Sequence, residues 1–325
     1  MRTVREFRPD WLILQYCAFA YGRWGLNPYL PLAIRRVMRA CPDTRFALMV
    51  HEPLAWPINW KLRLMNVWQR WQLRELGRTA DVVFFSIDPW VRQFGPWFPG
   101  TPAYHLPVGS NVPRVEITRE EARRRLSIPG ERVVLGLFGT AHHSRLFGLA
   151  GEAVGRLRSR GIDAGVLYIG PHGDRVRAAM GDVPSICEGP LPADEVSRRF
   201  SAMDIYLAPF ADGVSTRRTS LMTGLQHGCA VAATRGPLTD DVLLKEDGRA
   251  FLLSDVSDQD GFTANVVRLA EDADLRAALG SGARALHATE FAWERIAGRM
   301  LKLLRRYSGR ATAGEAESCR RTGGR

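Results

Sequence analysis

Apolar residues along this chain follow two alternating patterns. Short, nearly continuous apolar runs are typical of buried parallel strands, and longer stretches with apolar residues three or four positions apart are typical of helices. In the first third of the chain, the stretches 31–39 and 60–76 follow the helical pattern. The expected strands of this third are 11–16, 45–50, 81–86 and 103–107.

The alternation continues through the rest of the chain. A polar, turn-rich stretch at 109–116 (GSNVPRVE) separates the two parts, and we interpret it as a hinge. A last helix is expected over 272–307, with a break near Gly280 and Gly282. The strands expected after the hinge are 133–138, 164–169, 185–187, 204–208, 230–233 and 250–253.

Strands that alternate with helices predict parallel α/β sheets, and a chain of 325 residues is long enough for two such domains. The tail after the last helix has no apolar face, so we expect it to be disordered. The expected division is an N-terminal domain at 1–112, a second domain at 113–290, a helix at 291–307 that crosses back to the first domain, and a disordered basic tail at 308–325.

Composition narrows the class of protein. The sequence has no run of 18 apolar residues and no signal-peptide pattern at its start, which predicts a cytoplasmic protein without a membrane span. The cysteines are isolated and odd in number, so we expect no disulfide and no structural metal. They are Cys17, Cys41, Cys187, Cys229 and Cys319. We also expect no cofactor.

The net charge of +11 is concentrated in the first part of the chain, where residues 1–112 hold 14 basic and 7 acidic side chains. A basic surface suits an anionic membrane, an anionic acceptor or nucleic acid. The sequence contains no helix-turn-helix, zinc-finger or aromatic RNA-binding pattern, so we expect no nucleic-acid partner.

The segment 212–231 (DGVSTRRTSLMTGLQHGCAV) follows an expected strand and leads into a helix. Such loops line the ligand crevice of open α/β sheets, and the free N–H groups of a helix start favour an anion. Arg217 and Arg218 are candidates to grip phosphate oxygens, with hydroxyl groups around them. The alternative is a solvated arginine pair beside helix-capping hydroxyls. The hydroxyl residues are Ser215, Thr216, Thr219 and Ser220.

Four stretches together resemble the GT-B glycosyltransferases, particularly the large retaining family 4, also called glycosyl transferases group 1. The resemblance covers about residues 8–305 and implies two Rossmann-like, doubly wound parallel-sheet domains facing a cleft. It also implies transfer of a sugar from a nucleotide diphosphate sugar to an acceptor hydroxyl with retention, in polysaccharide, glycolipid or natural-product assembly. The stretches are 8–25, 106–113, 134–145 (VLGLFGTAHHSR) and 204–236.

In similar enzymes a helix beginning near Ser215 presents amides to the donor diphosphate, which makes Gly213 and the neighbouring hydroxyls donor-binding candidates. A Glu-x7-Glu pair normally binds the sugar and the ribose. Counting back from His227-Gly228, its two positions fall on Ser215 and Thr223, and neither is glutamate.

The resemblance also implies a donor contact from the loop after the first strand of the second domain. Gly139, Thr140 and His142 are donor-binding candidates there, and Arg145 is the basic residue expected to act on the leaving group. The alternative for Arg145 is a surface arginine on the next helix. His142 and His143 have no further ligand at metal spacing, so we expect no metal at this pair.

In the first domain, His51 occupies the position from which similar enzymes contact the donor sugar; the alternative is a capped histidine at a strand end. Glu52, Tyr21 and Gly22 are candidates for the acceptor side, and the alternative for Glu52 is a solvated carboxylate. The domain is shorter than in similar proteins by about two strand–helix units, so we expect it to be incomplete. A relic that binds a nucleotide or a partner protein without turnover is the alternative function.

The stretch 56–76 (WPINWKLRLMNVWQRWQLREL) is aromatic and basic. Trp60, Leu64, Val67, Trp68, Trp71 and Leu76 recur at helical spacing, with basic side chains largely elsewhere around the helix. One interpretation, which we favour, is a helix packed on its own sheet or against the neighbours of the missing strands. The other is a peripheral helix that meets the inner membrane face.

Overall fold

The computed structural model describes residues 2–55 and 59–322, with side chains described for 3–55 and 59–308. By its internal contacts the chain divides into two units. Unit 1 consists of residues 1–107 and 297–325, and unit 2 of residues 108–296. Each contains one parallel sheet, so the predicted α/β class is confirmed.

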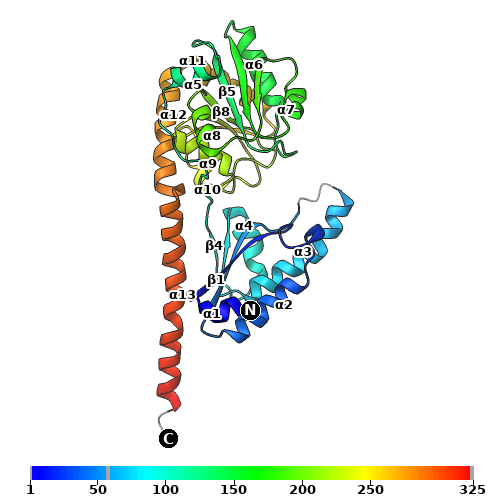
Figure 1. The fold of residues 1–325 in the computed structure, drawn as a ribbon, viewed down its shortest axis with the longest axis vertical. Helices are drawn as coiled ribbons and strands as arrows, with labels where there is room; N and C mark the ends of the chain where they lie inside the picture. The colour runs from blue at the N-terminus through cyan, green and yellow to red at the C-terminus, as the bar shows by residue number, and fades with distance from the viewer. Residues whose placement is uncertain (1, 56–58, 323–325) are drawn as a thin grey trace. The chain divides into compact units, whose positions relative to one another are not determined.

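In unit 1 the four strands pair in the order in which they occur in the chain, and every pair is parallel. All the connections therefore wind in one direction, which places the connecting helices on one side of the sheet. Figure 1 shows α2, α3 and α4 on this side. The strands are β1 (Trp11–Cys17), β2 (Arg45–Glu52), β3 (Val82–Phe85) and β4 (Ala103–His105), and the helical segments are α1 (Arg2–Phe7), η1 (Arg23–Gly25), α2 (Tyr29–Ala40), α3 (Trp60–Thr79), α4 (Asp88–Phe94) and η2 (Gly95–Trp97).

The six strands of unit 2 are also parallel, in the order β10-β9-β8-β5-β6-β7. The winding direction reverses between β5 and β8, and ligands bind at such switch points, beyond the carboxyl ends of the strands. The strands are β5 (Val133–Phe138), β6 (Ala164–Ile169), β7 (Ser185–Glu188), β8 (Ile205–Ala208), β9 (Ala230–Arg235) and β10 (Leu252–Asp255).

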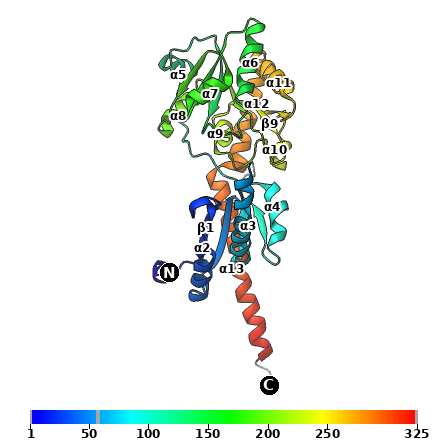
Figure 2. The same cartoon turned by 90° about the vertical axis from the view of Figure 1, so that its right-hand side faces the viewer.

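Both faces of this sheet are covered, because alternate strand residues contribute to two separate apolar cores. One core includes side chains of α5, α8 and α9, and the other includes side chains of α6, α7 and α11. Figure 2 shows the helices of unit 2 from a second direction. Their bounds are α5 (Arg119–Arg125), α6 (Gly148–Ser159), α7 (Gly173–Met180), α8 (Ala193–Phe200), α9 (Thr219–His227), α10 (Asp241–Leu244) and α11 (Gln259–Glu271).

The C-terminal helices differ from the sequence prediction in one respect. Gly280 and Gly282 do not break the helix but lie inside α12 (Ala273–Leu286). A Cβ atom at these glycines would come within 2.3 Å of the Gly228 carbonyl oxygen and 2.0 Å of the Arg249 carbonyl oxygen, so they serve close packing. The interruption comes later, in the π-helical turn η3 (His287–Phe291), before α13 (Trp293–Thr322).

Helix α13 contacts the sheet of unit 1 on the side opposite α3, as Figures 1 and 2 both show. The hydroxyl groups of Tyr307 and Tyr104 lie 2.5 Å apart, and the Trp11 indole donates to the Ser308 hydroxyl at 3.0 Å. Side chains are described only as far as residue 308. The disorder expected for 308–325 therefore stays a prediction.

Candidate functional site

Two loops meet at the switch point of unit 2, where β5 and β8 end. Phe210 and Arg145 form an isolated antiparallel bridge between the loops. On either side of this bridge, the Ala211 amide donates to the Ser144 carbonyl at 2.8 Å and the Leu146 amide donates to the Pro209 carbonyl at 2.9 Å. The backbone therefore fixes both loops at the place where this class of sheet binds ligands.

Arg145 is held at the centre of these loops with 9% of its surface exposed. Its Nη2 donates to the Phe138 carbonyl at 2.6 Å and to the Ser220 hydroxyl at 3.0 Å. Its Cζ lies 4.7 Å from the centre of the Phe210 ring. The buried Nη1 has no hydrogen-bond partner among the described residues, so this guanidinium keeps donor capacity. Arg145 is therefore not a surface arginine.

Arg217 and Arg218 share one carboxylate. Arg217 donates to Asp212 at 2.6 Å and Arg218 donates to both oxygens of Asp212 at 2.7 and 2.8 Å. The Arg218 Cζ also lies 4.3 Å from the centre of the Phe210 ring. Only 18% and 15% of the two arginine side chains and 7% of the aspartate side chain are exposed. The pair is thus internal rather than solvated.

Three guanidinium groups lie close together in this cluster. Those of Arg217 and Arg218 pair with the Asp212 carboxylate, and that of Arg145 lies against the Phe210 ring, which Arg218 also contacts. Burial lowers the pKa of Arg218 to about 10, and the positive charges of Arg217 and Arg145 act in the same direction while Asp212 opposes them. An anion bound here would relieve that repulsion.

Glycines allow the loops to pack this closely. Gly213 has a φ of +85°, and a Cβ there would lie 2.3 Å from the Gly236 nitrogen. Gly139 has a φ of +109°, and a Cβ there would lie 2.9 Å from the Arg145 Nη2 atom. The Thr216 amide donates to the buried Asp240 carboxylate at 2.6 Å. A side chain at Gly213 would press on Gly236 and Thr239, and one at Gly139 would press on the Arg145 guanidinium.

The two positions expected for the glutamate pair have different environments. The Ser215 hydroxyl is fully buried and has no hydrogen-bond partner among the residues described. The Thr223 hydroxyl lies 2.9 Å from the Thr219 carbonyl and 3.1 Å from the Ser110 hydroxyl. Ser110 in turn accepts at its carbonyl from the Trp293 indole at 2.7 Å. Thr223 is therefore engaged in fixing the segments that enter and leave unit 2.

The helix after the arginines begins four residues later than its predicted start near Ser215. Helix α9 begins at Thr219, and the N-cap residue is Arg218, whose side chain makes no capping hydrogen bond. The loop delays the helix because Val214 and Thr216 donate their amides to Thr234 and Asp240. The hydroxyl groups thus do not act as the side-chain N-cap that the sequence offered as an alternative.

The other residues predicted for this loop are exposed. Thr140, His142 and His143 lie at its tip, and the His142 Nδ1 atom is 2.9 Å from the Ser144 hydroxyl. The two imidazole rings are 3.8 Å apart. No group of three or more metal-ligating His, Cys, Asp or Glu side chains occurs in the described part of the chain.

The predicted residues of the first domain gather at the carboxyl ends of β1 and β2 in unit 1. The His51 Nε2 atom is 2.6 Å from the Gln15 Oε1 atom, and burial lowers the pKa of His51. Glu52 accepts from the Cys17 thiol at 3.3 Å, and the Tyr21 hydroxyl donates to the Gln15 carbonyl at 2.7 Å. Gly22 allows its turn to close, since a Cβ there would lie 2.3 Å from the Leu26 carbonyl oxygen. Their roles toward donor and acceptor stay predictions.

Sequence reasoning missed the partners that hold the arginines. Phe210 and Asp212 organise three guanidinium groups, and Asp240 anchors the loop before α9. One signal was available: Asp212 lies five and six residues before the two arginines, at a polar turn after a buried strand. Nothing in that spacing shows that the side chains fold back onto the carboxylate.

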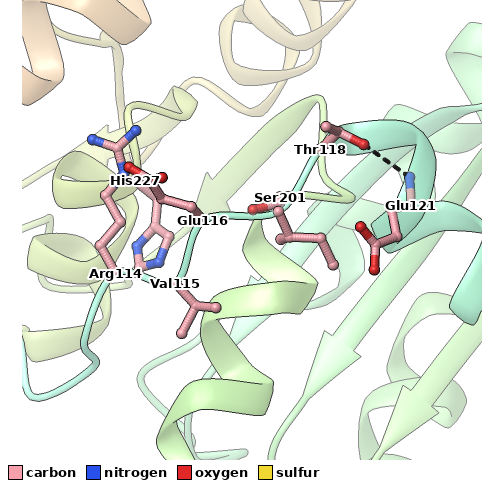
Figure 3. A pocket seen from close by; sticks show the side chains of 8 residues that line it. Arg114, Val115, Glu116, Thr118, Glu121, Ser201 and His227 are labelled. Carbon is pink, nitrogen blue, oxygen red and sulfur yellow. Dashed lines mark hydrogen bonds between the residues drawn. The ribbon is translucent and has the colours of Figure 1, made fainter.

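A separate open groove of about 480 Å³ lies in unit 2 at the last residue of α9. Figure 3 shows His227 beside Arg114 and Val115 at one end, and Thr118 and Glu121 at the other. The His227 Nδ1 donates to the Thr223 carbonyl at 2.8 Å, so the Nε2 accepts from the Ser197 hydroxyl, also at 2.8 Å. Burial lowers the pKa of His227. The lining residues are Arg114, Val115, Glu116, Ile117, Thr118, Glu121, Ser201 and His227.

No protein-family model matches the sequence, and no curated protein is significantly similar to it. Solved structures do match the fold. Sucrose-phosphate synthase from Thermosynechococcus elongatus has a TM-score of 0.67 and 15% identity, over 94% of this chain and 75% of that one. HepE of Anabaena, in complex with UDP and glucose, has a TM-score of 0.69 and 13% identity, over 94% and 80%. A glycosyltransferase from Rickettsia africae has a TM-score of 0.68 and 13% identity, over 94% and 79%.

These alignments cover 94% of this chain, and its two parallel-sheet α/β domains match GT-B glycosyltransferase folds. The chain therefore has the GT-B fold, as its sequence motifs predicted. In this fold the arginine cluster occupies the switch point of the C-terminal domain.

Proposed function

We propose that this protein is a glycosyltransferase that moves a sugar from a nucleotide diphosphate sugar to an acceptor hydroxyl. The observation that carries the proposal is the cluster of Arg145, Arg217 and Arg218 at the switch point of unit 2. Structural neighbours support the donor class, since HepE of Anabaena is described in complex with UDP and glucose.

The charge of the cluster suits the donor. The three arginines outnumber the Asp212 carboxylate that pairs with two of them, and the diphosphate of a nucleotide sugar carries two negative charges. The unused donor atoms Arg145 Nη1 and Arg218 Nε, with the Ser215 hydroxyl, are buried beside the start of α9. Buried guanidinium groups and helix amides are the groups that bind phosphate in proteins.

The same groups would stabilise the transition state. When the bond between the anomeric carbon and the phosphate oxygen breaks, its electron pair stays on the diphosphate, and the acceptor oxygen forms the new bond as its proton is released. Fixed positive charges aimed at the leaving group therefore bind the transition state more strongly than the intact donor. His51 is proposed to contact the donor sugar, Glu52, Tyr21 and Gly22 the acceptor. Retention of configuration follows the family resemblance.

The test is titration calorimetry of the full chain with UDP, GDP and the corresponding nucleosides. Arg145→Ala should weaken UDP or GDP binding by at least about tenfold, while nucleoside binding changes little. Arg156→Ala, which removes half of an exposed ion pair with Asp260 in unit 2, is the matched control. A folded chain that binds neither nucleotide, or an Arg145→Ala variant with unchanged affinity, would refute the proposal.

A second candidate is a nucleotide-binding protein without turnover. It is favoured by one observation, that Ser215 and Thr223 stand where the resemblance expects glutamates and that the Thr223 hydroxyl is already bonded to Ser110. Donor hydrolysis and transfer assays separate the two candidates. Nucleotide binding with no release of sugar from any UDP- or GDP-sugar would favour the non-catalytic candidate.

A further inference from the structure

Helix α3 of unit 1 buries Met65, Leu73 and Leu76 together with several polar side chains, but it leaves a second set of apolar side chains exposed. Trp60, Leu64, Val67 and Trp71 are 69%, 54%, 65% and 42% exposed. These four residues, the α3 stripe, are spaced four, three and four residues apart and so lie on one face of the helix. The interpretation of α3 as a helix whose aromatic face packs on its own sheet is wrong for these residues.

The buried side of α3 explains the orientation. Gln69 is fully buried; its Oε1 accepts from the Ala55 amide at 2.9 Å, and its Nε2 lies 3.4 Å from the Trp24 carbonyl. Gln72 accepts from the Asn27 amide at 3.0 Å. These bonds satisfy the backbone of two loops of unit 1, so the helix cannot turn its stripe inward without leaving buried amides unpaired.

A second aromatic side chain extends this surface. Trp24 is 63% exposed and has a φ of +60°, a backbone conformation that bulky residues rarely adopt. Its carbonyl accepts from the Trp68 indole at 3.2 Å, which ties the Trp24 loop to α3. The loop thus holds an indole ring in solvent next to the helix that carries the stripe.

Positive charge surrounds the apolar side chains. Helix α3 contains five basic residues and one acidic residue, Glu75, which is paired with Arg35 and Arg78. The Lys61 ammonium lies 5.8 Å from the Trp60 ring centre, and the Arg23 guanidinium lies 5.3 Å from the Trp24 ring centre. The basic residues of α3 are Lys61, Arg63, Arg70, Arg74 and Arg78.

We propose that the α3 stripe and Trp24 dock unit 1 on an anionic lipid bilayer. Indole rings and aliphatic side chains enter the boundary between headgroups and acyl chains, and lysine and arginine beside them pair with acidic headgroups. The positive surround decides between occupants, because a second copy of the same face would bring like charges together, whereas an anionic surface neutralises them. No helix of the described residues is long and apolar enough to cross a membrane, so the contact is peripheral.

The experiment is co-sedimentation of the full chain with vesicles of phosphatidylcholine, alone or containing phosphatidylglycerol. The chain should bind the anionic vesicles, and the fluorescence of the exposed indoles should shift to shorter wavelength. The combined variant Trp60→Gln, Leu64→Gln, Val67→Gln and Trp71→Gln should lower the partition coefficient by at least about tenfold. Leu244→Gln with Leu301→Gln changes leucines that are 42% and 51% exposed elsewhere and should bind like the unmodified chain.

Charge-reversal variants test the proposal independently if the stripe variant does not fold. Arg63→Glu with Arg70→Glu should reduce binding to anionic vesicles, whereas Arg158→Glu with Arg175→Glu, exposed in unit 2, should reduce it much less. Failure of the unmodified chain to bind anionic vesicles, or binding unaffected by the stripe and charge variants, overturns the proposal. Self-association abolished by the stripe variant, without vesicle binding, would assign the face to a second copy. Nucleotide titration is a separate measurement, so either proposal can fail alone.

Discussion

Helices α9 and α3 each follow a strand of a parallel sheet, yet they treat polar groups in opposite ways. At the start of α9, unit 2 encloses charge, with Arg217 and Arg218 paired to Asp212 and Arg145 beside the Phe210 ring. Helix α3 instead encloses neutral amides such as Gln69 and leaves its five basic side chains exposed. Buried charge in excess marks a place for a charged ligand, and exposed apolar surface marks a place for a partner.

Removal of the Asp212 carboxylate from unit 2 should have the largest effect. Asp212→Ala leaves the guanidinium groups facing one another without a counter-charge, and breaking a buried pair costs about 3–5 kcal/mol of unfolding free energy. Urea denaturation should show the loss. Pyrophosphate should then stabilise the variant more than the unmodified chain, because it supplies the missing negative charge.

The matched control is Glu271→Ala, which removes an ion pair with Arg160 whose side chains are 43% and 52% exposed. It should cost at most about 1 kcal/mol. If Asp212→Ala is as stable as Glu271→Ala, the Asp212 carboxylate is not needed to offset repulsion between the guanidinium groups.

Two glycines separate backbone strain from close packing. Gly213 in unit 2 and Gly100 in unit 1 have φ values of +85° and +86°, but a Cβ at Gly100 meets no atom within 4 Å. Gly100→Ala should cost about 1 kcal/mol of unfolding free energy. Gly213→Ala should cost roughly 2 kcal/mol more, because its Cβ would press on the next loop, and it alone should weaken nucleotide binding. Thermal and urea unfolding measure both losses. Equal losses of unfolding free energy in Gly100→Ala and Gly213→Ala would show that the loop around Gly236 moves to accommodate the new methyl group.

Within α3, buried amides and exposed indoles should respond differently to substitution. Gln69→Ala leaves the Ala55 amide without its acceptor and should lower the unfolding free energy by about 2 kcal/mol. Trp60→Gln removes a side chain that is 69% exposed and should change it by no more than about 0.5 kcal/mol. Similar losses in the two variants would mean that the stripe is packed in solution.

The smallest expected effect is on pH dependence. Burial lowers the pKa of His227 in unit 2 and of His51 in unit 1 below the ordinary histidine value of 6.5, so the unfolded chain binds protons more readily than the folded one. Stability should therefore fall as the pH drops below about 6.5. In His227→Gln and in His51→Gln, the melting temperature should fall less steeply as the pH drops below about 6.5. A profile as steep in both variants as in the unmodified chain would assign the acid sensitivity to other groups.

The sequence pattern was sufficient for the sheets, because buried parallel strands are short apolar runs and each predicted run matches a strand. It also identified the loop that carries Arg217 and Arg218. The sequence pattern was insufficient where contacts between distant residues determine how an element is oriented. The direction in which α3 faces depends on hydrogen bonds between Gln69 and Ala55, just before the helix, and between Gln72 and Asn27, more distant in the sequence. Helical spacing alone favours the aromatic face as the buried one.

The same limit applies to the arginine cluster. Local sequence predicts a phosphate loop, but the folding of Arg218 onto Asp212 and of Arg145 beside the Phe210 ring requires two loops from different strands to meet. The glycines near 280 illustrate the opposite error. Spacing indicates a break, whereas the contact with Gly228 shows that a side chain is absent because another backbone passes there.

The bond between Thr223 and Ser110 has a mechanical consequence. Ser110 lies where the chain enters unit 2, and Trp293, which donates to its carbonyl, lies where the chain leaves. Hydrogen bonds thereby link both connecting segments to the middle of α9. The first turn of this helix lies next to the arginines. The segments that enter and leave unit 2 are therefore linked, through Ser110, to one residue of the helix that carries the arginine cluster at its start.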